Sequence, residues 1–164
     1  MSRDVAAAHF SPDTQDFIRL LDRYQVHYLI VGGEAVIYYG YARLTGDVDF
    51  FYDRSAANAA RLFEALLEFW GGDIPGVAEA EELTQPDLVL QFGRPPNRID
   101  LLSRITGVAF AEAWAARREL SLVSEDGVSA PLYYIGLEHL IANKQASGRP
   151  KDLEDLGYLR GIAR

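Results

Sequence analysis

The sequence predicts one α/β or α+β domain over residues 1–164, in which a mixed central sheet is covered mainly by helices and two helices close the chain. Short apolar runs typical of buried strands alternate along the chain with segments whose apolar residues recur every three or four positions, as on amphipathic helices. This order of elements is typical of a layered domain built on a sheet. The 164 residues, 49% of them hydrophobic, also match a folded domain with one core.

The first predicted helix begins at Ser11 and Pro12, because serine can cap free backbone NH groups and proline suits the first helical turn. Four residues then form an apolar stripe at helical spacing: Phe17, Leu20, Leu21 and Tyr24. Further helices are predicted approximately over residues 34–39, 55–70, 77–83, 109–118, 137–146 and 150–159.

Six short runs are predicted to form the sheet: residues 28–31, 44–53, 88–92, 99–102, 120–123 and 132–134. The sequence GRPPN between the third and fourth runs contains turn-forming residues. We therefore expect these two strands to form a hairpin.

Composition narrows the classes of function. A formal charge of -8 argues against a protein whose whole surface binds nucleic acid, since phosphate binding depends on lysine and arginine. Positive charge gathers without nearby acids only at residues 143–151 and at Arg94 and Arg98, where a solvated loop is the plain interpretation. Without cysteine, any metal must be held by oxygen or histidine ligands. No apolar run is long enough for a membrane span or a signal peptide, so we expect a cytoplasmic protein with no membrane partner.

Two carboxylates alternate with large apolar residues in the strand DVDFFY. Side chains alternate between the faces of a strand, so Asp47 and Asp49 point to one face, with α carbons about 6.6 to 7 Å apart. Asp100 is a third acid inside an apolar strand, and the three would meet if the two strands were neighbours.

Three adjacent carboxylates without a cation would repel one another, whereas Mg²⁺ or Mn²⁺ prefers such hard oxygen ligands together with substrate phosphates. We therefore expect Asp47, Asp49 and Asp100 to be catalytic and to bind metal. For the D-x-D tripeptide alone, the favoured alternative is a turn residue followed by an edge residue that faces water.

The Gly32-Gly33 pair lies between an apolar strand and a helix. There, glycines allow the backbone to approach a ligand and leave the first NH groups of the helix free for phosphate. The pair has the spacing of neither a P-loop nor a dinucleotide fingerprint, and a tight turn is the simpler alternative.

Three blocks together resemble the nucleotidyltransferase superfamily that has the DNA polymerase beta-type fold: YLIVGGEAVIYYGYARLTGDVDFFYD, RIDLL and LEHLIANKQASGRPKDLEDLGYL. The likeness is strongest to small bacterial members related to AbiEii-type abortive-infection toxins. The resemblance implies transfer of a nucleoside monophosphate from an NTP to a hydroxyl group of a protein, an RNA such as tRNA, or a small molecule. It also implies a phage-defence or toxin–antitoxin role with a cognate toxin or antitoxin as partner.

By this resemblance Asp47 and Asp49 bind both metal ions, and Asp100 helps to activate the acceptor hydroxyl. Gly32 and Gly33 lie under the triphosphate, although many superfamily members have a serine where Gly33 stands.

Lys144 lies three, four and seven residues after Ile141, Leu140 and Leu137, so it belongs to the inward stripe of its helix. It either reaches into a polar cleft, where it binds nucleotide, or extends outward to solvent. Arg43 and Thr45 are further candidates for nucleotide contact, with turn closure as the alternative for Thr45.

The acids of the last helix are interpreted as surface residues. Lys151 and Asp155 have the i,i+4 spacing of an ordinary surface pair, and Asp152 suits the helix dipole.

The main alternative function is a non-catalytic module that binds nucleotide or a toxin–antitoxin partner. A haloacid-dehalogenase-type phosphatase is disfavoured because Phe50 and Phe51 follow the D-x-D motif. A calcium loop is disfavoured because this stretch is apolar where such a loop is polar.

Overall fold

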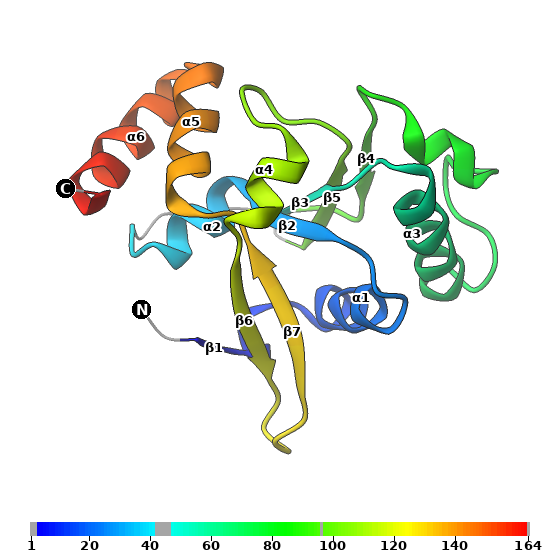
Figure 1. Ribbon diagram of the computed structural model, residues 1–164. Coiled ribbons are helices and arrows are strands. Elements are labelled where there is room, and N and C mark those ends of the chain that lie inside the picture. The colour runs from blue at the N-terminus through cyan, green and yellow to red at the C-terminus, as the bar shows by residue number, and fades with distance from the viewer. Residues whose placement is uncertain (1–2, 42–46, 96, 164) are drawn as a thin grey trace.

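The computed structural model describes residues 3–41, 47–95 and 97–163. Within these ranges, one mixed sheet has the strand order β1-β6-β7-β2-β3-β5-β4 (Figure 1). The strands are β1 (Asp4–Ala6), β2 (Tyr28–Val31), β3 (Asp47–Tyr52), β4 (Val89–Phe92), β5 (Arg98–Leu102), β6 (Arg118–Val123) and β7 (Ser129–Tyr134). This confirms the α+β class that the sequence predicts.

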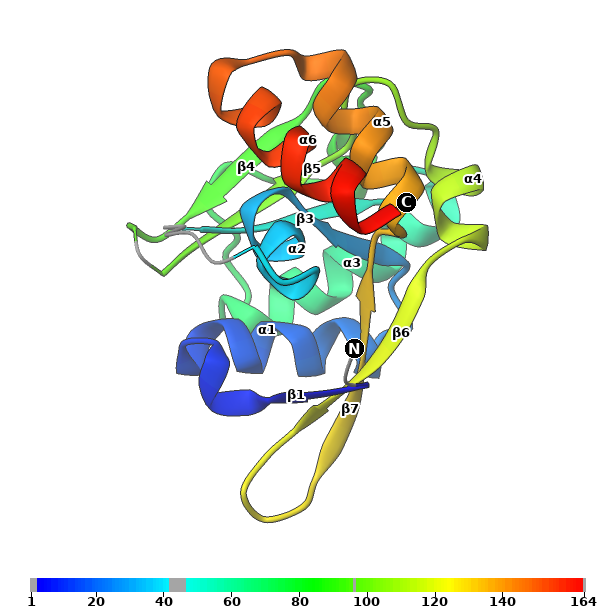
Figure 2. The same cartoon turned by 90° about the vertical axis from the view of Figure 1, so that its left-hand side faces the viewer.

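Helices cover the sheet on both sides. The α-helices are α1 (Pro12–Arg23), α2 (Gly32–Tyr38), α3 (Ala56–Phe69), α4 (Phe110–Ala115), α5 (Leu137–Ser147) and α6 (Pro150–Ala163), with short 3-10 turns at Ala7–His9 and Ala80–Thr84. Figure 2 shows α5 and α6 on one side of the central strands and α1 on the other. Among the described residues, no helix has the length and apolar content needed to cross a membrane.

The side chains of β3 alternate between the two faces of the sheet, and each face lies against a different layer of helices. Phe50 is fully buried and packs edge-on against Phe17 of α1, with ring centroids 5.3 Å apart. Phe51 points to the opposite face and packs against Phe110 of α4. Asp47 and Asp49 share the face of Phe51, so the apolar residues anchor the strand while the acids face the layer of α4, α5 and α6.

The predicted hairpin of β4 and β5 is confirmed as an antiparallel pair. Other local details differ from the sequence predictions. The helix predicted over residues 109–118 ends at Ala115, because Arg118 already pairs with Tyr134 in the β6–β7 ladder. The segment predicted as helical over residues 77–83 is a 3-10 turn, and the edge strand β1 was not predicted.

Candidate active site

The parallel pairing of β3 with β5 brings the three predicted acids together. In this register Asp49 lies opposite Asp100 and Asp47 lies opposite Arg98. Because paired residues point to the same face of a sheet, the carboxylates of Asp47, Asp49 and Asp100 gather on the face beneath α5 and α6. Asp100 is buried, whereas Asp47 and Asp49 are partly buried.

Arg98 joins two of these acids. Its Nη2 donates to Asp47 Oδ2 at 2.7 Å, and its Nε donates to Asp100 Oδ1 at 2.8 Å. Interpreting Arg98 as a solvated-loop residue was therefore wrong. The strand places it two residues before Asp100, on the same face, and the guanidinium supplies part of the positive charge that the crowded carboxylates require.

The ionised form of Asp49 is destabilised by its surroundings. Burial and the adjacent carboxylate of Asp100, with which it shares a hydrogen bond, raise the pKa of Asp49 to about 7. Burial and the charge of Asp100 also raise the pKa of Asp47, while Arg98 opposes that shift. The site therefore favours any additional positive charge that approaches Asp49.

Gly32 makes room for Asp49. Gly32 has φ +65°, and a Cβ at this position would lie 2.3 Å from Asp49 Oδ2. The turn between β2 and α2 therefore requires glycine both for its backbone conformation and for the space that the carboxylate occupies. Gly33 follows in the first turn of α2 and also lines the cleft.

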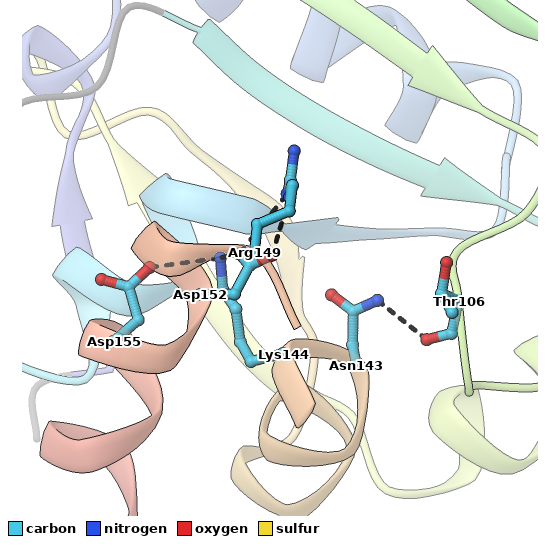
Figure 3. A network of polar contacts seen from close by, with 6 residues as sticks. All are labelled: Thr106, Asn143, Lys144, Arg149, Asp152 and Asp155. Carbon is cyan, nitrogen blue, oxygen red and sulfur yellow. Dashed lines mark hydrogen bonds and ion pairs between the residues drawn. The ribbon is translucent and has the colours of Figure 1, made fainter. Parts of the chain in front are cut away.

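Lys144 reaches the cleft from α5 and is held in place by two acids of α6 (Figure 3). Its Nζ lies 3.0 Å from Asp152 Oδ1 and 3.3 Å from Asp155 Oδ2. The Lys144 side chain is only 5% exposed, so it points inward, as the helical spacing predicts, and does not extend to solvent. Its contact with nucleotide stays a prediction.

The surface interpretation of Asp152 and Asp155 was wrong. Their side chains are 1% and 2% exposed, because α6 packs its acidic stripe against α5 instead of facing water. Although burial opposes ionisation of Asp152, hydrogen bonds from Arg149 and Lys144 lower its pKa below the ordinary value. Both acids therefore serve to fix cations beside the cleft.

These groups line one cleft of about 400 Å³ between the sheet and the last two helices. It brings together Gly32, Gly33, Asp47, Asp49, Asp100 and Lys144, along with Arg98, Arg149 and Lys151. Arg43 and Thr45, also predicted to contact nucleotide, lie outside the described residues.

The donor set of the cleft fits a divalent cation. Three carboxylates supply hard oxygen atoms. Because residue 32 is glycine, no Cβ occupies the space next to Asp49 Oδ2. With the side chains as they stand in the described part of the chain, no group of three or more His, Asp or Glu residues forms a metal centre. Arg98 holds oxygens of Asp47 and Asp100, so a metal ion and this guanidinium would compete for them.

Sequence reasoning missed four residues at or beside the cleft, and a spacing rule could have indicated three of them. Arg98 and Asp100 are separated by two positions in one strand, which places them on one face. Asp152 and Asp155 have the spacing of an inward helical stripe that continues through Leu156 and Leu159. Arg149 lies in the turn between two helices, where no spacing rule applies. Its only signal was the positive charge of residues 143–151, and interpreting that segment as a solvated loop was wrong, because most of it belongs to α5 and α6.

Comparison with known protein families gives a match. The model of a family described as "Nucleotidyltransferase of unknown function (DUF6036)" matches residues 13–159. None of the curated proteins matches the chain.

The high pKa of Asp49 predicts a pH-dependent gain in stability for the Asp49→Asn variant in metal-free buffer. The folded pKa, about 7, exceeds the ordinary value of 3.8, so the folded protein retains a proton that the unfolded chain loses. The contribution of Asp49 to the stability of the wild type therefore falls as pH rises from about 4 to about 7 and is level above that. Asparagine does not titrate, so the variant should exceed the wild type by about 2 to 4 kcal/mol at pH 8.

Thermal unfolding at pH 4 and pH 8 checks this. The Tm of Asp49→Asn should exceed that of the wild type by about 5 to 10 °C at pH 8 and should differ little from it at pH 4. Asp73→Asn, at an exposed position, is the matched control and should change Tm little at either pH. If Asp49→Asn raised Tm by the same amount at both pH values, the raised pKa of Asp49 would be contradicted.

Proposed function

Because the chain belongs to this family of nucleotidyltransferases, we propose that it transfers a nucleoside monophosphate from an NTP to a hydroxyl group of a protein, an RNA or a small molecule. The observation that supports this most is the β3–β5 register, which sets Asp49 opposite Asp100 beside the Gly32 turn. A cleft with carboxylates on one wall and cations on the other suits a metal-bound triphosphate.

Asp47, Asp49 and Asp100 would hold Mg²⁺ or Mn²⁺, which when bound supplies neutralising charge to the phosphates and lowers the pKa of the acceptor hydroxyl. Arg98 would have to release the oxygens that it holds on Asp47 and Asp100 for these acids to bind the cation. Its guanidinium remains within the cleft, where it can bind phosphate oxygens instead.

The chemical step is a displacement at the α-phosphorus. The acceptor oxygen forms a bond to this phosphorus, the bond to the bridging oxygen of the β-phosphate breaks, and pyrophosphate leaves. The carboxylate of Asp100 accepts the proton of the hydroxyl. Asp100 pairs in register with Gln91 of the edge strand β4, so the acceptor approaches from the β4 side of the cleft.

The cations of the helical layer stabilise the leaving group. Lys144 is oriented by Asp152 and Asp155, so its ammonium loses little side-chain freedom when phosphate binds. Arg149 binds Asp152 through Nε at 2.7 Å and also lines the cleft. Both are suited to the charge that develops on pyrophosphate.

One observation favours a second candidate, a non-catalytic nucleotide-binding module. Arg98 already neutralises Asp47 and Asp100, and a permanent contact of this kind would leave Asp49 without its partners as metal ligands. Such a module would bind an NTP through Lys144 and Arg149 without turnover. The two candidates differ in whether binding of the NTP depends on a divalent cation.

Transfer of label from an α-labelled NTP to the acceptor fraction of a cell extract tests the proposed activity. With Mg²⁺ or Mn²⁺ present, the wild type should label an acceptor, and Asp49→Asn or Asp100→Asn should reduce the rate at least about 100-fold, because each removes an oxygen ligand and a negative charge. Asp73→Asn, at an exposed position, should leave the rate unchanged.

Titration calorimetry of the same variants separates the two candidates. Metal-dependent NTP binding that weakens in both site variants is expected for the transferase. Tight NTP binding that requires no metal and is unchanged by both substitutions, without transfer of label, would support the non-catalytic module. It would contradict the proposed activity.

Gly32→Ala should abolish transfer while leaving the protein folded at a moderate cost in stability. Alanine at φ +65° is strained by about 1 to 2 kcal/mol, and its Cβ displaces the carboxylate of Asp49. Gly71 is a matched control, since it has φ +66° and no atom within 4 Å of an added Cβ. Urea unfolding should give similar losses for Gly32→Ala and Gly71→Ala, while only the first loses transfer. Full activity in Gly32→Ala would disprove the role of this turn.

A further inference from the structure

A second cavity adjoins the cleft on the side of α5. It has a volume of about 370 Å³, which is within the range of small-molecule pockets. The two cavities share five lining residues: Gly32, Asp49, Leu102, Lys144 and Arg149. A ligand whose phosphates contact Lys144 and Arg149 can therefore extend into this second cavity without leaving the site.

The walls of this cavity differ from those of the cleft. Val31, Leu102 and Ile105 supply apolar surface, whereas Thr106, Asn143 and Ser147 supply polar groups. Among the described residues that line it, there is neither Asp47 nor Asp100. An acceptor hydroxyl has to meet Asp100, so the cavity suits the part of a nucleotide that is remote from the reacting phosphorus.

Asn143 presents a hydrogen-bond acceptor to the cavity. Its Nδ2 donates to the carbonyl oxygen of Thr106 at 2.9 Å, and Figure 3 shows its amide oxygen turned away from Thr106. The opposite amide orientation would place two oxygens against each other, so this contact fixes which atom is offered. A ligand group that bonds to Oδ1 of Asn143 has to be a donor.

The loop that orients Asn143 is itself held firmly. Ile105 and Val108 form a bridge across Thr106 and Gly107. Gly107 has φ +77°, and an added Cβ would lie 2.6 Å from the Cβ of Ala146 on α5. This close approach packs the loop against α5, so the Thr106 carbonyl is in place before any ligand binds.

We propose that this second cavity is the nucleobase pocket, and that Asn143 selects a purine with an exocyclic amine at position 6, as in adenine. The apolar wall receives the face of the ring, and Asn143 Oδ1 accepts a hydrogen bond from the amine. A 6-oxo purine would place an oxygen against Oδ1 and leave it without that bond. The inference rests on the proposed function, since it concerns the base of the same NTP.

Titration calorimetry with ATP and inosine triphosphate in Mg²⁺ tests this, because the two nucleotides differ at position 6. We expect the wild type to bind ATP about 5- to 20-fold more tightly than inosine triphosphate. In Asn143→Ala this ratio should fall to within about twofold, mainly through weaker binding of ATP. Gln145→Ala, an amide on the exposed side of the same helix, is the matched control and should keep the ratio.

The outcomes separate this inference from the proposed function. Equal affinities of the wild type for both nucleotides would overturn the base pocket while leaving nucleotide binding intact. A preference for ATP that survives Asn143→Ala would overturn the role of Asn143. Absence of binding to either nucleotide would overturn both the pocket and the proposed function. The comparison of nucleotides on the wild type decides the base preference even where the variant does not fold.

Discussion

The site depends on one constraint, the parallel pairing of β3 with β5. A shift of one residue would turn Asp100 into the core and leave Asp49 opposite an apolar side chain. In the observed register Asp49 faces Asp100, and Phe50, which points the other way, is packed against α1. The energy that keeps the acids together therefore comes from the apolar face of the same strands, and the crowded carboxylates are stabilised by the core beneath them.

Crowding of negative charge explains the remaining arrangement of the cleft. Arg98 neutralises the acids from within the sheet, and the Asp49 carboxyl holds a proton up to a pH of about 7. On the opposite wall the relation is reversed, because two buried acids hold Lys144 in place. The cleft thus presents charges of both signs, which suits the metal-bound triphosphate that we propose as its ligand.

Patterns of short period made much of the fold and site predictable. Period-two alternation indicated the shared face of Asp47 and Asp49, and helical spacing indicated the inward direction of Lys144. The pairing of β3 with β5 is a long-range contact that local patterns do not determine. The sequence could therefore predict only conditionally that Asp47 and Asp49 lie next to Asp100. Asp155 was misjudged because a local i,i+4 rule was preferred over the packing of α6 on α5. The second cavity depends on a loop and a helix distant in sequence, and no spacing rule indicates it.

The most direct test of the account is a crystal structure of the protein with Mn²⁺ and a non-hydrolysable NTP analogue, in which anomalous scattering locates the metal. The account predicts manganese within about 2.0 to 2.3 Å of carboxylate oxygens of Asp49 and at least one of Asp47 and Asp100. Arg98 should have moved away from those oxygens, and the phosphates should lie between Gly32 and Lys144. A nucleotide bound elsewhere, or manganese remote from all three acids, would contradict it.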